Sequence, residues 1–291
     1  MNGSSDLCLF VSDLHGRLDR YEKLFAAIRA RRPAAVFLGG DILPSGIAAA
    51  LTGGIPAEDF IAHYLALRLH EIRVTLSRNY PDLFVILGND DGATAEADLL
   101  AGQAAGMWHY VHNRVVPFQE YSVLGYSFVP PSPFLLKDWE RYDVSRYVDP
   151  GCVSPEEGVH TQEFDAEATR YGTIERDLKA LTQGLHMSRT ICLFHTPPYE
   201  TNLDWVDHNG KTVDGVEPDR HIGSIAVRRL IETRQPLLTL HGHAHESAEL
   251  SGHWQDQIGK TLMFGAATRD SGLALVSFQL GDLATAQREL L

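Results

Sequence analysis

Five short apolar runs dominate the hydrophobic pattern of the chain. They are LCLFVS (7–12), AAVFLG (34–39), LFVILG (83–88), TICLFH (190–195) and LLTLH (237–241). Each run has the length of a strand and is uninterrupted rather than alternating, which is typical of strands buried on both faces. Apolar residues at helical spacing predict helices over 17–31, 57–80 and 221–234. This succession of strands and helices predicts a layered α/β protein.

Two regions depart from this pattern. Residues 261–267 and 273–280 look like strands joined by a short loop, and 121–130 is another strand-like run. We expect these three runs to build a second, more antiparallel sheet. Residues 131–160 are rich in Pro, Gly and charge, and their aromatic residues need something to pack on. We interpret them as an inserted loop or lid region within a single domain that spans 1–291.

Charge and composition narrow the classes of function. The chain has 291 residues, with 25 Lys and Arg against 38 Asp and Glu, and a formal net charge of −13. Because affinity for phosphate backbones rests on Lys and Arg, this balance makes binding to nucleic acid or an anionic membrane unfavourable, although a small anionic substrate is compatible with it. The sequence has neither an apolar run of membrane-spanning length nor a signal-peptide pattern at its start, so we expect a cytoplasmic protein. It predicts no particular oligomeric state.

Side chains that can bind metals follow each of the five apolar runs. They are Asp13 and His15 after the first run, Asp41 after the second, Asn89, Asp90 and Asp91 after the third, His195 at the end of the fourth, and His241, His243 and His245 at the fifth. Because sites in open α/β sheets form beyond the carboxyl ends of the strands, we expect these side chains to converge. Their carboxylate, carboxamide and imidazole donors suit Mn, Fe, Zn, Co or Ni. The donors are too many for one tetrahedral ion and indicate two ions about 3.5–4 Å apart.

Each of these residues also has an ordinary structural interpretation. Asp13 could cap the helix that starts near Arg17, Asp41 and Asn89 could be turn residues, and His195 could be a hydrogen-bonded histidine at a strand end. The occurrence of such residues at five strand ends favours the metal site over five separate coincidences.

The motifs, taken in order, resemble those of the calcineurin-like metallophosphoesterase superfamily. They are Asp13-x-His15, Gly40-Asp41, Gly88-Asn89-x-Asp91, His195 and Gly242-His243-x-His245. The stretch 221–247 is also similar to the closing segment of the small prokaryotic branch of that superfamily. The resemblance implies a four-layer α/β/β/α sandwich of two mixed sheets flanked by helices, with the metals at one edge of the sheets.

The resemblance also implies a role for each residue. Asp13, His15 and His245 would bind the first metal, Asn89, His195 and His243 the second, and Asp41 would bridge them. The implied cofactors are two divalent metal ions, foremost Mn, Fe or Zn, with Co or Ni as alternatives. The implied reaction is hydrolysis of a phosphoester by a hydroxide held between the two ions. In the TLHGHAH stretch, His241 would be the last strand residue, either buried or supporting a ligand from behind.

One position departs from the family pattern. Many members carry a histidine directly after the Asn, and that histidine is thought to contact the phosphate and to protonate the leaving group; this chain has Asp90. Asp90 is a poor acid near two metals unless burial raises its pKa. Alternatively, the leaving group needs little protonation and another group assists, with His221 and His160 as candidates on the substrate side.

The sequence also bears on the substrate. Protein phosphatases of the superfamily carry GDxxDRG after the second strand, whereas this chain has GDILPSG, which disfavours a phosphoprotein substrate. We therefore predict a metal-dependent phosphoesterase acting on a small substrate, with a phosphodiester or nucleotide-like ester favoured. The alternatives are a nuclease of the same superfamily and a non-catalytic, metal-binding scaffold protein.

Overall fold

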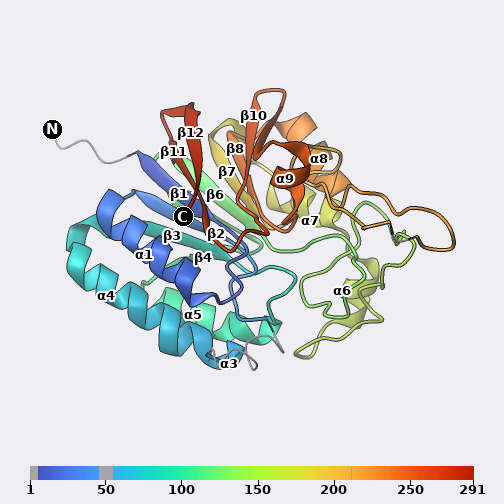
Figure 1. Cartoon of the computed structure of the whole chain (residues 1–291), viewed down its shortest axis with the longest axis horizontal. Helices are drawn as coiled ribbons and strands as arrows, with labels where there is room; N and C mark the ends of the chain where they lie inside the picture. The colour runs from blue at the N-terminus through green and yellow to red at the C-terminus, as the bar shows by residue number, and fades with distance from the viewer. Residues whose placement is uncertain (1–5, 46–54, 211) are drawn as a thin grey trace.

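The computed structural model describes residues 6–45, 55–210 and 212–291, and within them two six-stranded mixed sheets pack face to face (Figure 1). In spatial order, sheet A consists of β12 (Asp282–Leu290), β11 (Ala274–Gln279), β1 (Leu7–Val11), β2 (Ala35–Gly39), β3 (Asp82–Ile86) and β4 (His109–Tyr110). Sheet B consists of β5 (Arg114–Phe118), β6 (Tyr121–Tyr126), β7 (Thr190–Phe194), β8 (Leu238–His241), β10 (Thr261–Gly265) and β9 (Gln255–Ile258). The central strands of each sheet run parallel, and β11, β12, β5 and β9 are antiparallel to their neighbours.

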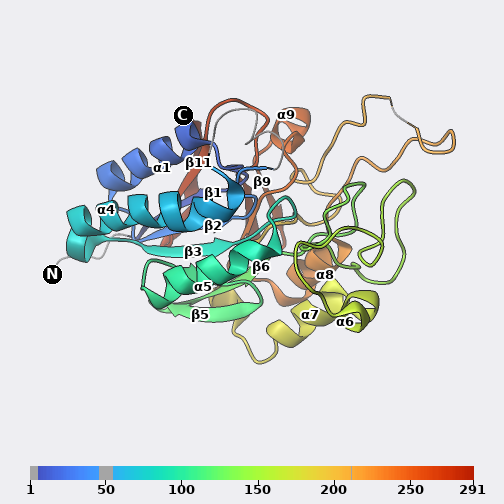
Figure 2. The ribbon, with the colours of Figure 1, turned by 90° about the horizontal axis from the view of Figure 1, so that it is seen from below.

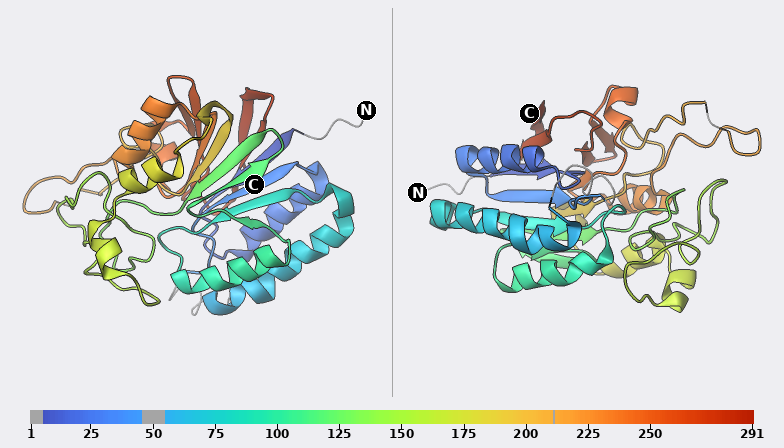
Figure 3. Two further views of the ribbon diagram at one scale, coloured as in Figure 1. Left: turned by 180° about the vertical axis from the view of Figure 1, so that it is seen from behind. Right: turned by 60° about the horizontal axis from the view of Figure 1, so that its bottom comes forward.

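Helices cover the outer face of each sheet (Figures 2 and 3). On sheet A lie α1 (Leu18–Arg31), α3 (Ala57–Phe60), a π-helical turn (Ile61–Leu65), α4 (Ala66–Leu76) and α5 (Glu96–Ala104). On sheet B lie α7 (Ile174–Leu181) and α8 (Ile225–Arg234). Short elements complete the set: α6 (Ala166–Tyr171), α9 (Ser247–Ser251) and 3₁₀ turns at Ser77–Asn79, Ala93–Ala95 and Met187–Arg189. No helix of the described residues is both long enough and apolar enough to cross a membrane.

The buried side chains form three apolar layers, and this is why the strand sequences are continuously apolar. In β1, Leu9 and Val11 pack against the helices on sheet A, whereas Phe10 faces the other sheet. In β7, Leu193 faces sheet A and Phe194 packs under α7 and α8. Because successive side chains of a strand point to opposite faces, a strand with a core on both sides must be apolar at every position. The α/β/β/α sandwich implied by the sequence resemblance is confirmed.

Two predicted elements need correction. The predicted strand 273–280 does form, as β11, but it pairs antiparallel with β1 in sheet A rather than joining the second sheet. The loop after β10 therefore passes from one sheet to the other, and no periodicity in the sequence reports such a crossing. The helix predicted over 221–234 begins only at Ile225, because the Ser224 hydroxyl accepts a hydrogen bond from the Val227 N–H and caps it.

Residues 127–165 contain isolated bridges but no regular helix or strand. Together with residues 199–210 and 212–224 they extend beyond the ends of the strands, on one side of the sandwich (Figures 1 and 3). A buried ion pair between Lys137 and Glu140 organises this segment from within, since both side chains are fully buried and both also bind Ser132. The segment is thus built around its own polar core rather than around regular secondary structure.

Candidate metal centre

Tight turns after β1 and β2 place the first group of predicted ligands. The backbone N–H of Asp13 donates to the Gly40 carbonyl at 3.0 Å, and that of His15 donates to the Asp41 carbonyl at 2.8 Å, so the two turns are joined. Asp13, His15 and Asp41 have φ angles of 57°, 47° and 50°, in the left-handed region that non-glycine residues seldom adopt. Each such residue costs about 1–3 kcal/mol, and this kind of strain clusters at functional sites. The strain turns all three side chains toward one point.

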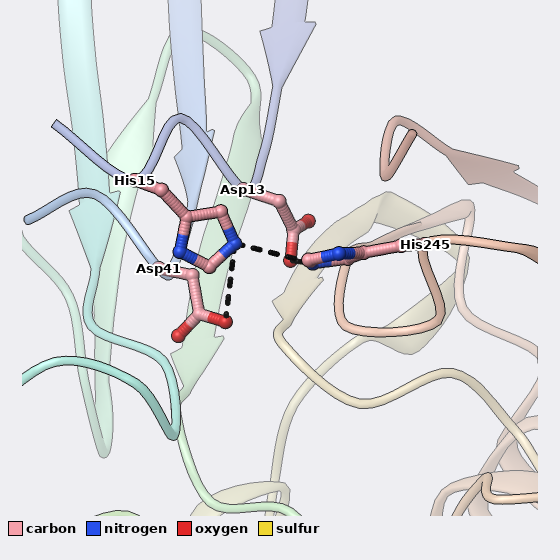
Figure 4. A group of neighbouring side chains, drawn as sticks. All are labelled: Asp13, His15, Asp41 and His245. Carbon is pink, nitrogen blue, oxygen red and sulfur yellow. Dashed lines mark hydrogen bonds and ion pairs between the residues drawn. The ribbon is translucent and has the colours of Figure 1, made fainter. Parts of the chain in front are cut away.

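Asp13, His15, Asp41 and His245 form a group whose ligand atoms all lie within 4.8 Å of one another (Figure 4). His245 Nε2 lies 3.0 Å from Asp13 Oδ1 and 3.2 Å from His15 Nε2. Asp41 Oδ2 lies 4.0 Å from His15 Nε2. Two imidazole nitrogens and two carboxylates that face a common centre are a donor set that fits a divalent transition metal.

A second group of predicted ligands lies on the other side of Asp41. His195 Nε2 is 3.1 Å from Asn89 Oδ1 and 3.4 Å from Asp41 Oδ2, and its ring centroid is 5.3 Å from that of His243. The His195 Nδ1–H donates to the Gly39 carbonyl at 2.8 Å, which leaves the lone pair of Nε2 facing the group. Asp41 therefore lies between the two groups, and all seven predicted ligands gather at one edge of the sandwich.

The carboxylates and imidazoles of the centre strongly shift one another's pKa values. Burial raises the pKa of Asp13 and Asp41, but the charges of the nearby histidines outweigh it and lower both values below the ordinary range. Burial lowers the pKa of His15 and His195, but hydrogen bonds and carboxylate charges outweigh it and raise both to about 9. At His243 burial dominates and lowers the pKa to about 3, so that imidazole is neutral and has a lone pair to offer. Ionised carboxylates beside a neutral imidazole are donors that suit bound cations.

Two glycines allow the loops to approach closely. A Cβ on Gly242 would lie 2.0 Å from Ser12 Oγ and 2.6 Å from Asp13 Oδ2. A Cβ on Gly88 would lie 2.4 Å from Asp41 Oδ1. Both positions therefore require glycine, because any side chain would push the ligand-bearing turns apart.

His241 and Asp91 serve the fold rather than the ligand set. His241 is the last residue of β8, as expected, and is fully buried. Its Nδ1–H donates to the Thr196 carbonyl at 2.9 Å, and Nε2 lies 2.7 Å from Thr239 Oγ1, so both ring nitrogens have protein partners. Asp91 accepts hydrogen bonds from the backbone N–H groups of Gly88, Ile42 and Leu43 at 2.9, 3.1 and 2.8 Å. It joins the turns after β2 and β3.

His221 and His160 lie in the loops that extend beyond the strands, and their contacts in the described chain are with those loops. His221 Nδ1 lies 2.9 Å from Asp204 Oδ1, and its ring packs edge-on against Trp205. His160 stacks on Phe164, donates from Nε2 to the Pro155 carbonyl at 3.0 Å, and has Nδ1 3.5 Å from an Asp138 oxygen. His160 thus has partners for both ring nitrogens, whereas in the described part of the chain His221 has a polar partner on Nδ1 alone.

Sequence reasoning missed two residues that support the site. The buried guanidinium of Arg20 donates to the backbone carbonyls of Asp13 and Asp270 at 2.5 and 2.6 Å and so holds the strained turn from behind. Asp138 accepts from the backbone N–H of Ala93 at 2.7 Å and ties the segment 127–165 to the loop that follows β3. Neither stands out in the sequence, because Arg20 is one of several arginines in its helix and Asp138 lies in an irregular segment.

Comparison with known proteins identifies the family. The sequence profile of the calcineurin-like phosphoesterases matches residues 8–247. The chain belongs to the calcineurin-like phosphoesterase family, as the order of its motifs predicted. None of the curated proteins compared with the chain matches it.

Solved structures share the fold at low sequence identity. A protein of Thermus thermophilus is 18% identical over 98% of both chains, with a TM-score of 0.53. A dimetal phosphatase from Danio rerio is 12% identical over 94% of this chain and 92% of its own, with a TM-score of 0.52. The Phosphopantetheinyl Hydrolase (PptH) from Mycobacterium tuberculosis is 12% identical over 91% of each chain, with a TM-score of 0.51.

Proposed function

We propose that this protein is a metal-dependent phosphoesterase that hydrolyses a small phosphodiester or nucleotide-like ester. The observation that carries the proposal is the donor set at the sandwich edge, where Asp41 lies between the group around His245 and the group around His195. A bridging carboxylate between two sets of imidazole donors is the arrangement of a dinuclear hydrolytic centre.

The chain's own residues would divide the work. Asp13, His15 and His245 would hold one divalent ion, Asn89, His195 and His243 the other, and Asp41 both. When bound, the ions would lower the pKa of a coordinated water and neutralise charge on the phosphoryl oxygens. The protein contributes the orientation of the donors: the Gly39 carbonyl fixes the tautomer of His195, and the strained turn aims Asp13 at His245.

The loops beyond the strand ends would form the walls of the substrate site. We propose this role for residues 131–160, 199–210 and 212–224, because Asp138 joins the first of these segments to the loop that carries Asn89. His221 is the better of the two substrate-side candidates, since Asp204 binds its Nδ1 and can hold Nε2 toward a ligand. His160 donates from Nε2 to the Pro155 carbonyl, and its Nδ1 lies beside an Asp138 oxygen, so both ring nitrogens face protein atoms.

Two features favour a diester or nucleotide-like ester over a phosphoprotein. The family histidine that follows Asn89 is replaced by Asp90, so an ester with a readily departing group is the better substrate. The sequence GDILPSG lacks the Asp and Arg of the protein-phosphatase signature.

The test uses the purified full chain, freed of metal by chelation and reloaded with Mn²⁺, Fe²⁺ or Zn²⁺. Chromogenic phosphodiesters and phosphomonoesters are assayed beside single-stranded DNA, with metal content measured by elemental analysis. We expect turnover of the diester that is lost in His245→Ala and retained in His253→Ala, whose histidine is exposed. Bound metal without turnover of either ester would refute the proposal. Efficient cleavage of DNA with steep salt dependence would instead indicate a nuclease. Failure to bind metal would indicate a scaffold protein.

A further inference from the structure

Asp90 occupies the position of the family's phosphate-contacting histidine, but its side chain points toward a different partner. Asp90 Oδ2 lies 3.3 Å from His15 Nδ1. The carboxylate is 45% exposed and the imidazole 20% exposed, so the pair lies at the rim of the centre. The backbone N–H of Asp90 also donates to Asp41 Oδ1 at 2.8 Å. One residue therefore contacts two of the predicted ligands, one through its side chain and one through its backbone.

The opposite side of the His15 ring faces the metal centre. His15 Nε2 lies 3.2 Å from His245 Nε2 and 4.0 Å from Asp41 Oδ2. When Nδ1–H donates to a carboxylate, the proton is held at Nδ1 and the lone pair at Nε2 is directed to the metal. The His15 imidazole is thus held from behind by Asp90, much as His195 is held by the Gly39 carbonyl.

A carboxylate in this arrangement does not suit the role of acid. It accepts a hydrogen from an imidazole N–H and so has no proton of its own to donate. We propose that Asp90 is a positioning residue that orients His15 toward the first metal, and that it is not the group that protonates the leaving ester oxygen. This inference rests on the metal-dependent function proposed above, but its primary measurement needs no substrate.

The experiment titrates metal-free protein with Co²⁺ and Zn²⁺ by calorimetry, following the Co²⁺ complex by its visible absorption. The variants are Asp90→Ala and Asp90→Asn, and both keep the backbone N–H that binds Asp41. The matched control is Asp19→Ala, which removes a half-exposed carboxylate whose partner is Arg17. Circular dichroism verifies that each variant is folded.

We expect Asp90→Ala to weaken the affinity of one metal site by about 10–100-fold, the usual effect of removing the partner of a ligating histidine. Asp90→Asn retains an oxygen that can accept from Nδ1–H, so it should bind metal more tightly than Asp90→Ala. The Asp19→Ala control should bind like the unaltered protein. Unchanged affinity in Asp90→Ala, or equal loss in the two Asp90 variants, would overturn the inference.

A second measurement separates positioning from proton donation. Turnover is compared at saturating metal on a diester with a nitrophenol leaving group and on one with an alkanol leaving group. A positioning role predicts the same fractional loss on both esters. A selective loss on the alkanol ester, with metal affinity intact, would assign Asp90 as the acid and refute our inference. If the unaltered protein cleaves neither ester but Asp90→Ala still loses metal, the positioning role stands and the proposed function fails.

Discussion

The three histidines of TLHGHAH allow fold stability and metal binding to be separated by single substitutions. His241, His243 and His245 recur at every second position, yet the structure gives them different surroundings. His241 is fully buried with both ring nitrogens bound, whereas His245 is 34% exposed and its Nε2 faces Asp13. We expect His241→Ala to lower the free energy of unfolding while the metal site still forms. We expect His245→Ala to weaken metal binding with little loss of unfolding free energy.

The magnitudes follow from the contacts that each variant loses. His241→Ala removes a buried ring and leaves the Thr196 carbonyl and the Thr239 hydroxyl without their partner, which costs about 2–4 kcal/mol of unfolding free energy. His245→Ala removes a partly exposed side chain, and its cost in the metal-free protein should be about 1 kcal/mol. Loss of a direct ligand should weaken the binding of its metal by more than about 100-fold, beyond the usual effect of losing a ligand's supporting partner.

His243 adds an internal check on the strained turn. Its φ of 70° lies in the left-handed region, which glycine tolerates and alanine does not. His243→Ala and His243→Gly should lose metal equally, but the glycine variant should be more stable by about 1 kcal/mol. Both comparisons use urea unfolding of the metal-free proteins together with metal titration. If all three alanine variants lost metal equally while His241→Ala stayed as stable as the unaltered protein, our account of this loop would be wrong.

Three further predictions follow from the same structure. Gly242→Ala should lower metal affinity and should lower the unfolding free energy by about 1–3 kcal/mol, because its Cβ would lie 2.0 Å from Ser12 Oγ. Adding Ser12→Ala to this variant should restore part of the affinity and part of the stability. If neither is restored, the steric cause is wrong. Burial lowers the pKa of His112 to about 3 from its ordinary 6.5, so the unfolded chain takes up the proton first and stability falls as pH drops below 6.5. The loss from this group is about 2 kcal/mol at pH 5, and urea unfolding at pH 7 and 5 should show a smaller loss for His112→Asn; an equal loss would refute the assignment. His221→Asn should lower turnover without loss of bound metal, whereas His160→Asn should leave turnover near that of the unaltered protein; the opposite order would exchange their roles.

The strands that carry the predicted ligands could be predicted because burial on both faces leaves a clear signal. Each is a largely apolar run, and a residue with a metal-binding side chain follows within three residues of its end. The pairing of β11 with β1 could not be predicted, because a strand's sequence records which of its faces are buried and not which strand lies beside it. Two edge strands could not be predicted either, because β4 has only two residues and β9 is the polar stretch QDQI.

The contacts that support the centre could not be predicted from the sequence for a different reason. Asp13, His15, Asp41 and His243 all adopt positive φ angles. Ordinary residue preferences give no sign of this, because such conformations persist only when the surrounding structure imposes them. The direction of each side chain therefore could not be deduced from spacing. The contact between Asp90 and His15 depends on one such turn, that of His15, and could be found only in three dimensions.

The two groups of predicted ligands depend on how the two sheets pack against each other. In the first group Asp13 and His15 follow a strand of sheet A, and His245 follows a strand of sheet B. The second group likewise joins Asn89 from sheet A to His195 from sheet B. The separation of the donors is therefore set by the apolar layer between the sheets. Because protein interiors are close-packed and resist deformation, we expect that layer to fix the geometry of the centre. The strain of the turns is then the local cost of directing donors from two sheets toward a shared centre. Because Asp41 lies between the two groups, a shift of either sheet would change its distance to His15 or to His195.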